Sequence, residues 1–217
     1  MPGARARTGA DFTPAASRGA VRDLILIGNP NVGKSVLFGA LTRRYVTVSN
    51  YPGTTIEVTR GAARIDGQPC QILDTPGTNQ LTPMSEDERV TRDILLQTPD
   101  ACVLQVADAK NLRRALTLTM ELAELGAPVV LALNMQDEAR ERGIRVSRER
   151  LEEFLGVPVV ETVAIRRQGI SRLQEATARA ARPRETARYP DVIEHWIQAL
   201  LPHLAREGSR ARFLALQ

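Results

Sequence analysis

The segment 28–35 has the residue types of a phosphate-binding loop, because it reads Gly-Asn-Pro-Asn-Val-Gly-Lys-Ser. It follows an apolar run at 21–27, and a helix is expected from about residue 35. This order of strand, loop and helix separates a phosphate cradle from an ordinary glycine turn that binds nothing. Gly28 and Gly33 let the backbone curl so that successive N–H groups face a polyphosphate. The helix adds the positive end of its dipole.

Two side chains of this loop supply charge and metal chemistry. Lys34 is expected to reach the β- and γ-phosphates, and the hydroxyl of Ser35 is expected to be a ligand of Mg²⁺. Only Lys34 and Lys110 are lysines among 29 basic residues, so a compact point charge is favoured over arginine here. The residues predicted to contact the phosphates are Gly28, Asn29, Pro30, Asn31, Val32, Gly33, Lys34, Ser35 and Val36.

A carboxylate follows a short apolar strand further along the chain. Residues 70–73 read Cys-Gln-Ile-Leu and run into Asp74-Thr75-Pro76-Gly77. At the end of a strand beside the cradle, Asp74 can hold Mg²⁺ through water, and the N–H of Gly77 can bind the γ-phosphate. Asp-Thr-Pro-Gly is also a common turn sequence, so its position after the first motif decides the interpretation.

A third segment indicates which base is bound. Residues 128–133 have the composition of a buried parallel strand and run into Asn134-Met135-Gln136-Asp137. The carboxylate of Asp137 can accept hydrogen bonds from N1–H and the 2-amino group of guanine, whereas adenine lacks this pattern. Asn134 is expected to tie this loop to the phosphate loop. The usual guanine motif has lysine at the position of Met135, whose side chain can cover the base without the charge.

The base-reading loop is completed by residues 157–164, which read Val-Pro-Val-Val-Glu-Thr-Val-Ala. They predict a strand that leads into a loop. The backbone N–H of Ala164 is the expected donor to guanine O6, with a register uncertainty of about one residue. The residues predicted to contact the nucleoside are therefore Asn134, Met135, Asp137, Thr162, Val163 and Ala164.

These motifs together resemble the TRAFAC-class small GTPases, and in particular the family of ferrous-iron transport protein B (FeoB). Besides the phosphate loop and the guanine motif without lysine, the segment 45–58, Tyr-Val-Thr-Val-Ser-Asn-Tyr-Pro-Gly-Thr-Thr-Ile-Glu-Val, is similar to the first switch of that family. Segments 188–194 and 210–216 resemble pieces of the helical domain that follows its G domain. The resemblance extends over residues 21–217.

The resemblance implies roles for individual residues. Thr55 would ligate Mg²⁺ when GTP is bound, with Thr54 as the alternative if the register differs by one. Asn31 stands where the family binds an activating K⁺. Thr78 stands where Ras-like proteins place a water-orienting glutamine, so slow hydrolysis, faster in K⁺ than in Na⁺, is expected. The implied catalytic residues are Lys34, Asn31, Thr55 and Gly77, and the implied metal ligands are Ser35, Thr55 and Asp74 for Mg²⁺ and Asn31 for K⁺.

The pattern of elements around these motifs predicts an α/β fold. Strands alternate with helices as in a doubly wound sheet, and an Asp-Gly turn at 66–67 indicates a hairpin. The fold class is that of a Ras-like P-loop GTPase, with a mostly parallel six-stranded sheet, one antiparallel edge strand and a C-terminal helical appendage. The strands are expected at 21–27, 56–65, 70–73, 101–107, 128–133 and 157–160, and the helices at 35–43, 86–97, 111–125, 147–155 and 169–181.

Composition and charge limit the possible partners. The chain has 217 residues, 43% of them hydrophobic, and a net charge of +4. Arginine clusters at 140–150 and 179–188 lack interleaved aromatic residues, so a solvated surface is favoured over a nucleic-acid site. No apolar run approaches the ~20 residues that span a bilayer.

The domain organisation follows from these segments. We expect a disordered arm at 1–20, a G domain at 21–182 and part of a helical domain at 188–217. The sequence does not indicate an oligomeric state. A stripe of apolar residues after Pro190 recurs at helical spacing and is expected to pack on the G domain.

Two functions are consistent with the sequence. In the first, the chain binds and hydrolyses GTP as the regulatory domain of a ferrous-iron transporter, at the inner face of the bacterial plasma membrane. Its partner would be a membrane-embedded region, in cis or as a separate chain, and its ligands GTP or GDP, Mg²⁺ and K⁺. The alternative is an assembly GTPase on ribosomes or tRNA, which commonly shares the Asn-Pro-Asn-Val-Gly-Lys-Ser loop but carries lysine in the guanine motif and an RNA-binding tail.

Overall fold

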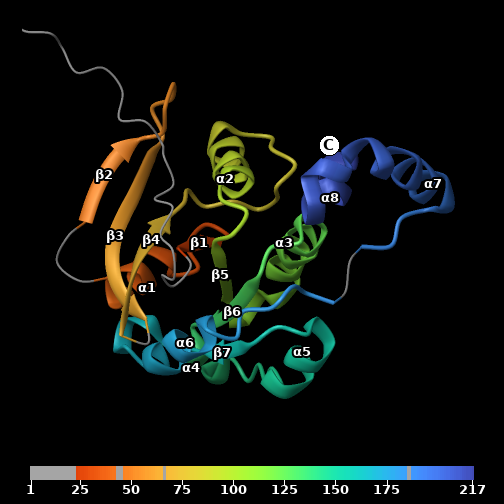
Figure 1. The fold of residues 1–217 in the computed structure, drawn as a ribbon. Helices are drawn as coiled ribbons and strands as arrows, with labels where there is room; N and C mark the ends of the chain where they lie inside the picture. Colours follow the sequence, from red (N-terminus) through yellow and green to blue (C-terminus); the bar gives the residue numbers. More distant parts are fainter. Residues whose placement is uncertain (1–22, 43–45, 66, 185–186) are drawn as a thin grey trace, which may run out of the picture.

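The structure is a computed structural model that describes residues 23–42, 46–65, 67–184 and 187–217. Helices cover both faces of a central twisted sheet, and the C-terminal helices lie beyond α3 at one side (Figure 1). The arm predicted at 1–20 lies outside the described residues. Among the described residues, no helix combines the length and apolar character needed to cross a bilayer.

Over the described residues the sheet has seven strands in the order β2-β3-β4-β1-β5-β6-β7. β3 is antiparallel to β2 and β4, and the remaining pairs are parallel. The predicted class, a mostly parallel α/β sheet with one antiparallel strand at an edge, is confirmed, except that the antiparallel strand β3 lies one place in from the edge strand β2. The strands are β1 (Leu24–Gly28), β2 (Val46–Asn50), β3 (Glu57–Ile65), β4 (Gln68–Asp74), β5 (Cys102–Asp108), β6 (Val129–Asn134) and β7 (Val159–Glu161).

The predicted count of six strands is wrong, because β2 forms a seventh. β2 lies in the segment predicted to be the first switch, and it pairs with β3 from Val46 opposite Gly61 to Asn50 opposite Glu57. Every residue of β2 is exposed, so neither face packs on a core. β2 reads Val-Thr-Val-Ser-Asn, with only two apolar residues in alternation, and the prediction for this segment depended on its resemblance to a switch.

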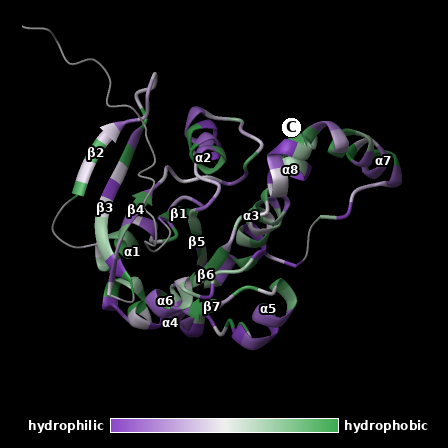
Figure 2. Ribbon diagram, viewed as in Figure 1, coloured by the Kyte–Doolittle hydropathy of each residue, from purple (hydrophilic) through white to green (hydrophobic). Residues whose placement is uncertain are grey.

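Alternate residues of β1 point to opposite faces of the sheet and divide the core in two. Ile25 and Ile27 pack with α2, α3 and α5, whereas Leu24 and Leu26 pack with α1 and α6. Figure 2 shows the hydrophobic colour concentrated in the central strands. The helices outside the C-terminal segment are α1 (Lys34–Leu41), α2 (Glu86–Gln97), α3 (Leu112–Leu125), α4 (Gln136–Glu141), α5 (Arg148–Leu155) and α6 (Ile170–Thr177), with 3₁₀ turns η1 (Ala109–Asn111) and η2 (Ala164–Arg166).

The C-terminal segment contains α7 (Asp191–Leu200), the 3₁₀ stretch η3 (Leu201–Arg210) and α8 (Ala211–Ala215). Phe213 of α8 joins the core on the α3 side of the sheet. The apolar stripe of α7 was expected to pack on the G domain, but this is wrong for most of it, because only Ile197 is buried. Trp196 is 64% exposed and Leu200 is 42% exposed. α8, not α7, thus attaches the segment to the sheet layers.

Arg212 connects this segment to the rest of the molecule. Arg212 of α8 contacts the carboxylate of Glu124 on α3 through Nε, and its Nη2 lies 2.9 Å from Glu194 Oε1 on α7. The side chain of Glu124 is 2% exposed. A buried carboxylate that loses its partner keeps the cost of its desolvation. Loss of this ion pair is therefore expected to destabilise the folded protein.

Replacing Arg212 by alanine is therefore expected to lower the free energy of unfolding by about 2–3 kcal/mol. Urea denaturation followed by circular dichroism measures this change. Arg206→Ala removes an exposed arginine from η3 and serves as the matched control. A midpoint for Arg212→Ala equal to that of Arg206→Ala would contradict this role.

Candidate functional site

The segment 28–35 forms a tight loop between β1 and α1. Gly33 has a φ of 84°, in the left-handed region that favours glycine, and a Cβ there would lie 2.5 Å from Asn134 Nδ2. A Cβ on Gly28 would lie 2.5 Å from the carbonyl oxygen of Val106 in β5. Residues of other strands come too close to both positions for a side chain to fit, so both must be glycine. Helix α1 begins at Lys34, at the end of this segment.

A pocket of about 420 Å³ lies against this loop. Gly28 and Val32 were also predicted to contact phosphate; both are buried, and they are not among the residues that line the pocket. Asp87, in the first turn of α2, lines the pocket and was not predicted, since an acidic residue at a helix start has an ordinary capping explanation. The residues that line the pocket are Asn29, Pro30, Asn31, Gly33, Lys34, Ser35, Val36, Gly77 and Asp87.

The charged groups predicted for phosphate and metal binding come together at the end of β4. Lys34 Nζ contacts Asp74 Oδ1 and donates to the carbonyl oxygen of Thr75. Ser35 Oγ lies 3.1 Å from Asp74 Oδ2. The Lys34 and Asp74 side chains are only 10% and 9% exposed. The Lys34 ammonium is therefore paired within the protein, and it can contact another ligand only by leaving these partners.

The turn after Asp74 packs directly on the phosphate loop. A Cβ on Gly77 would lie 3.2 Å from Pro30 Cα, so this position brings the second motif against the first. Thr78 is fully buried, its N–H donates to the Gly28 carbonyl (3.0 Å), and its hydroxyl donates to the Gln80 carbonyl (2.6 Å). Its hydroxyl is therefore already used in a hydrogen bond within this turn.

The two candidate switch threonines lie in the turn between β2 and β3, and neither is among the residues that line the pocket. Thr54 Oγ1 donates to the Tyr51 carbonyl (3.0 Å) and accepts from the Ile56 N–H (3.2 Å). Thr55 is exposed. Since the Thr54 hydroxyl stabilises the turn itself, the geometry favours Thr55 over Thr54 as the residue available for a ligand.

Asn134 joins three loops from the carboxyl ends of the strands. Its Nδ2 donates to the Val32 carbonyl (3.0 Å), which is the expected tie to the phosphate loop. Its Oδ1 accepts from Thr162 Oγ1 (3.1 Å) and from the N–H of Ala164 (3.0 Å). Asn134 is 2% exposed, so its amide must find partners inside the protein.

This geometry changes the expectation for Ala164. Its N–H was predicted to donate to guanine O6, but here it satisfies Asn134. Val163 and Thr162 are buried, with Val163 N–H bonded to the Gln168 carbonyl (3.2 Å). The loop therefore positions Asn134 in this structure, and any contact of Ala164 with the base requires that its N–H be shared or released.

Asp137 lies in the first turn of α4, a short helix that was not predicted. Met135 precedes it in the left-handed conformation with a φ of 61°. Asp137 Oδ2 lies 3.6 Å from Nη2 of Arg166, whose side chain is 58% exposed. The Asp137 side chain is itself only 15% exposed, and at 3.6 Å from an exposed arginine the ion pair is a weak one.

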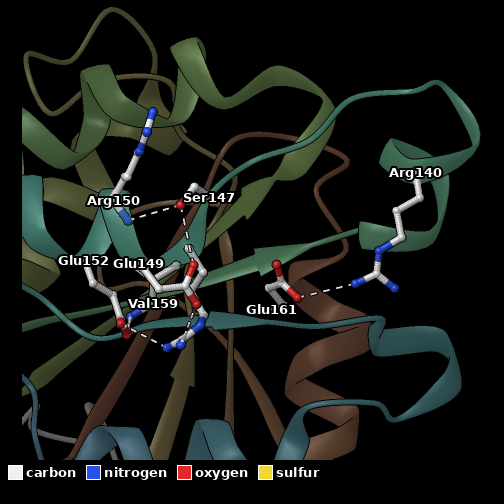
Figure 3. Close-up of polar contacts among 8 residues, drawn as sticks. Arg140, Ser147, Glu149, Arg150, Glu152, Val159 and Glu161 are labelled. Carbon is white, nitrogen blue, oxygen red and sulfur yellow. Dashed lines mark hydrogen bonds and ion pairs between the residues drawn. The ribbon is translucent and has the colours of Figure 1, made fainter.

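Side chains of α4 and α5 contact the two ends of β7 (Figure 3). Arg140 of α4 lies 3.4 Å from Glu161, the last residue of β7. Glu152 of α5 accepts a hydrogen bond from the N–H of Val159 at 2.9 Å. These contacts connect both ends of the short strand to the neighbouring helices, and the hydrogen bond from Val159 is the less exposed of the two.

The chain matches known proteins along most of its length. Residues 22–177 match the family described as Ferrous iron transport protein B. The Fe(2+) transporter FeoB of Staphylococcus aureus (strain MSSA476) is 34% identical over 199 residues, which are 88% of this chain and 30% of that protein. The Fe(2+) transporter FeoB of Legionella pneumophila (strain Paris) is 41% identical over 156 residues, 70% of this chain and 21% of that protein. The chain thus spans about a third of the length of these relatives or less.

Solved structures give the same result for the fold. The cytosolic domain of L. pneumophila FeoB superposes with a TM-score of 0.83 at 35% identity, over 89% of this chain and 86% of that one. A GDP-bound variant of S. thermophilus NFeoB superposes with a TM-score of 0.80 at 36% identity, over 90% of this chain and 78% of that one.

Proposed function

The chain belongs to the family of ferrous iron transport protein B, and from this we propose that it binds and hydrolyses GTP as the regulatory G domain of a ferrous-iron transporter. The observation that carries the proposal is the convergence of Lys34, Ser35 and Asp74 beside a pocket bordered by the phosphate loop. The GDP in the S. thermophilus relative supports a guanine nucleotide as the ligand.

The oxygen ligands around Ser35 fit Mg²⁺. A hydroxyl and a carboxylate oxygen 3.1 Å apart at the pocket edge are hard donors, which Mg²⁺ prefers. When bound with GTP, Mg²⁺ would neutralise charge on the β- and γ-phosphate oxygens. Ser35 would bind it directly and Asp74 through water, while Lys34 holds the same phosphates. Thr55 would complete the ligands after the turn between β2 and β3 moves toward the pocket.

Asn31 fits the role of a potassium ligand. It lines the pocket, it is exposed, and its backbone is in the left-handed conformation with a φ of 64°. Its side-chain amide oxygen is a suitable ligand for a monovalent cation, which would neutralise charge that develops on the phosphates. The N–H of Gly77 would bind the γ-phosphate. Because the Thr78 hydroxyl is directed to Gln80, it is not available to orient the attacking water, and we infer slow hydrolysis that depends on K⁺.

Replacing Asn31 by alanine is expected to remove most of the K⁺ stimulation, a loss of at least about tenfold in kcat measured in K⁺. The rate of hydrolysis in Na⁺ should change little, because Asn31 is proposed to act only by binding K⁺. Phosphate release in matched K⁺ and Na⁺ buffers measures both rates. Asn31→Asp keeps an oxygen at this position and should retain the stimulation. K⁺ stimulation that survives in Asn31→Ala would refute the assignment.

The partner is proposed to be a membrane-embedded transporter region, in cis or as a separate chain, with the G domain at residues 21–182 and part of a helical domain at 188–217. The relatives named above are much longer than this chain. Retention on membranes of the source cell at physiological salt, after fractionation, would support this partner and a location at the inner face of the plasma membrane. Salt-sensitive sedimentation with ribosomes would instead support an RNA-associated GTPase.

A further inference from the structure

The second of the two lysines lies at the base-reading side of the site. Lys110 belongs to η1, immediately after β5, and its side chain is 12% exposed. Its Nζ lies 3.2 Å from Asp108 Oδ1, 2.9 Å from Glu138 Oε2 and 3.0 Å from Met135 Sδ. One ammonium group thus joins the end of β5 to the guanine motif and to α4.

The fold, and not the sequence spacing, creates this contact. β5 and β6 are parallel, and Asp108 is in register with Asn134. The residues that follow these two strands, Lys110 and Met135, therefore emerge at the same edge of the sheet, where such sheets bind ligands. Burial disfavours the charge of Lys110, but hydrogen bonds and charges from Glu138 and Asp108 outweigh it and raise the pKa of Lys110. The group stays cationic at neutral pH.

Met135 connects this ammonium to the phosphate loop. Its Cε lies 3.7 Å from the position of a Cβ on Gly33, and its Sδ accepts the contact from Lys110. Lysine is the usual residue at position 135 in guanine motifs, and Sδ of methionine takes the place of Cδ in lysine. The ammonium of Lys110 therefore lies within contact distance of the space that the side chain of a lysine at 135 would fill.

We propose that Lys110 and Met135 together replace the single lysine of the usual guanine motif, with Met135 covering the base and Lys110 supplying the ammonium that holds the motif for the bound guanine nucleotide. This inference rests on the proposed function, because it assigns a positioning residue for the same site. The inference predicts that the ammonium group can be moved from position 110 to position 135 without loss of nucleotide binding.

The test compares Lys110→Gln, Met135→Lys and the double variant by equilibrium titration with a fluorescent N-methylanthraniloyl derivative of GDP. Loss of one charge-assisted hydrogen-bonding group predicts that Lys110→Gln weakens binding about tenfold. In the double variant the ammonium returns from position 135, so affinity should recover to within about threefold of the wild type. Arg113→Gln, on the exposed face of α3, controls for the loss of one positive charge.

A purely structural link between η1 and α4 would give a different result. Lysine at 135 would then not rescue binding, and thermal unfolding of Lys110→Gln would shift in parallel with its affinity. Wild-type affinity in Lys110→Gln, or a double variant as weak as Lys110→Gln, would overturn the inference while wild-type protein still binds GDP. Failure of the wild-type protein to bind GDP would instead overturn the proposed function.

Discussion

Replacing Lys34 by alanine is expected to weaken binding of GTP and GDP by at least about 100-fold, because the variant loses charge-assisted hydrogen bonds to the phosphates. The position is confined: the Lys34 side chain is 10% exposed and lies between Asp74 and the Thr75 carbonyl. Titration with the fluorescent GDP derivative, followed by competition with GTP, measures both affinities.

The variant Lys34→Arg sharpens this test. It keeps the positive charge, but a planar guanidinium is larger than an ammonium and cannot present a compact point charge in this space. We expect it to bind nearly as weakly as Lys34→Ala. Arg89→Ala, exposed on α2, is the control that should bind normally. Full affinity in Lys34→Ala, with thermal stability unchanged, would show that the phosphates are held elsewhere.

The second large effect concerns the base. Replacing Asp137 by asparagine is expected to weaken GDP binding by about 100-fold, since the 2-amino group of guanine then meets an N–H donor instead of a carboxylate. Xanthine carries an oxygen at that position, so xanthosine diphosphate should bind Asp137→Asn far better than it binds the wild type. Competition of GDP, xanthosine diphosphate and ADP against the fluorescent GDP derivative gives the three affinities.

The same experiment separates base reading from stability. Within the part of the chain that the structure describes, the ion-pair partner of Asp137 is the exposed Arg166 at 3.6 Å, so its replacement should change the unfolding midpoint little. Glu141→Gln removes an exposed carboxylate from the same helix and should keep the preference for guanine. An unchanged order of affinities in Asp137→Asn would place the base somewhere other than beside this residue.

The elements that the sequence predicted well are those with a strong local signal. α2 was predicted at 86–97 and is found at Glu86–Gln97, where Ser85 accepts from the Glu88 N–H as an N-cap. The predicted strands at 101–107 and 128–133 each differ by one residue from β5 and β6, whose residues are buried almost throughout. Continuous burial and capping leave an unambiguous pattern of residue types.

Elements without such a signal were missed. β2 has no buried residue, and α4 is six residues long with only two of them buried. Short or fully exposed elements are stabilised by pairing with a neighbour, not by their own amphipathic pattern. The exposed stripe of α7 was misplaced because a helical period shows which face is apolar but not what covers it.

The sequence by itself determined the phosphate loop, the carboxylate at Asp74 and the tie from Asn134, because each depends on residue types at fixed spacing after a strand. Only the tertiary structure decided that Ala164 serves Asn134, that Arg166 lies beside Asp137 and that Lys110 reaches Met135. These contacts join residues 25 to 30 positions apart, and they exist because parallel strands bring their carboxyl ends to one edge. No spacing along the chain specifies which side chains meet there.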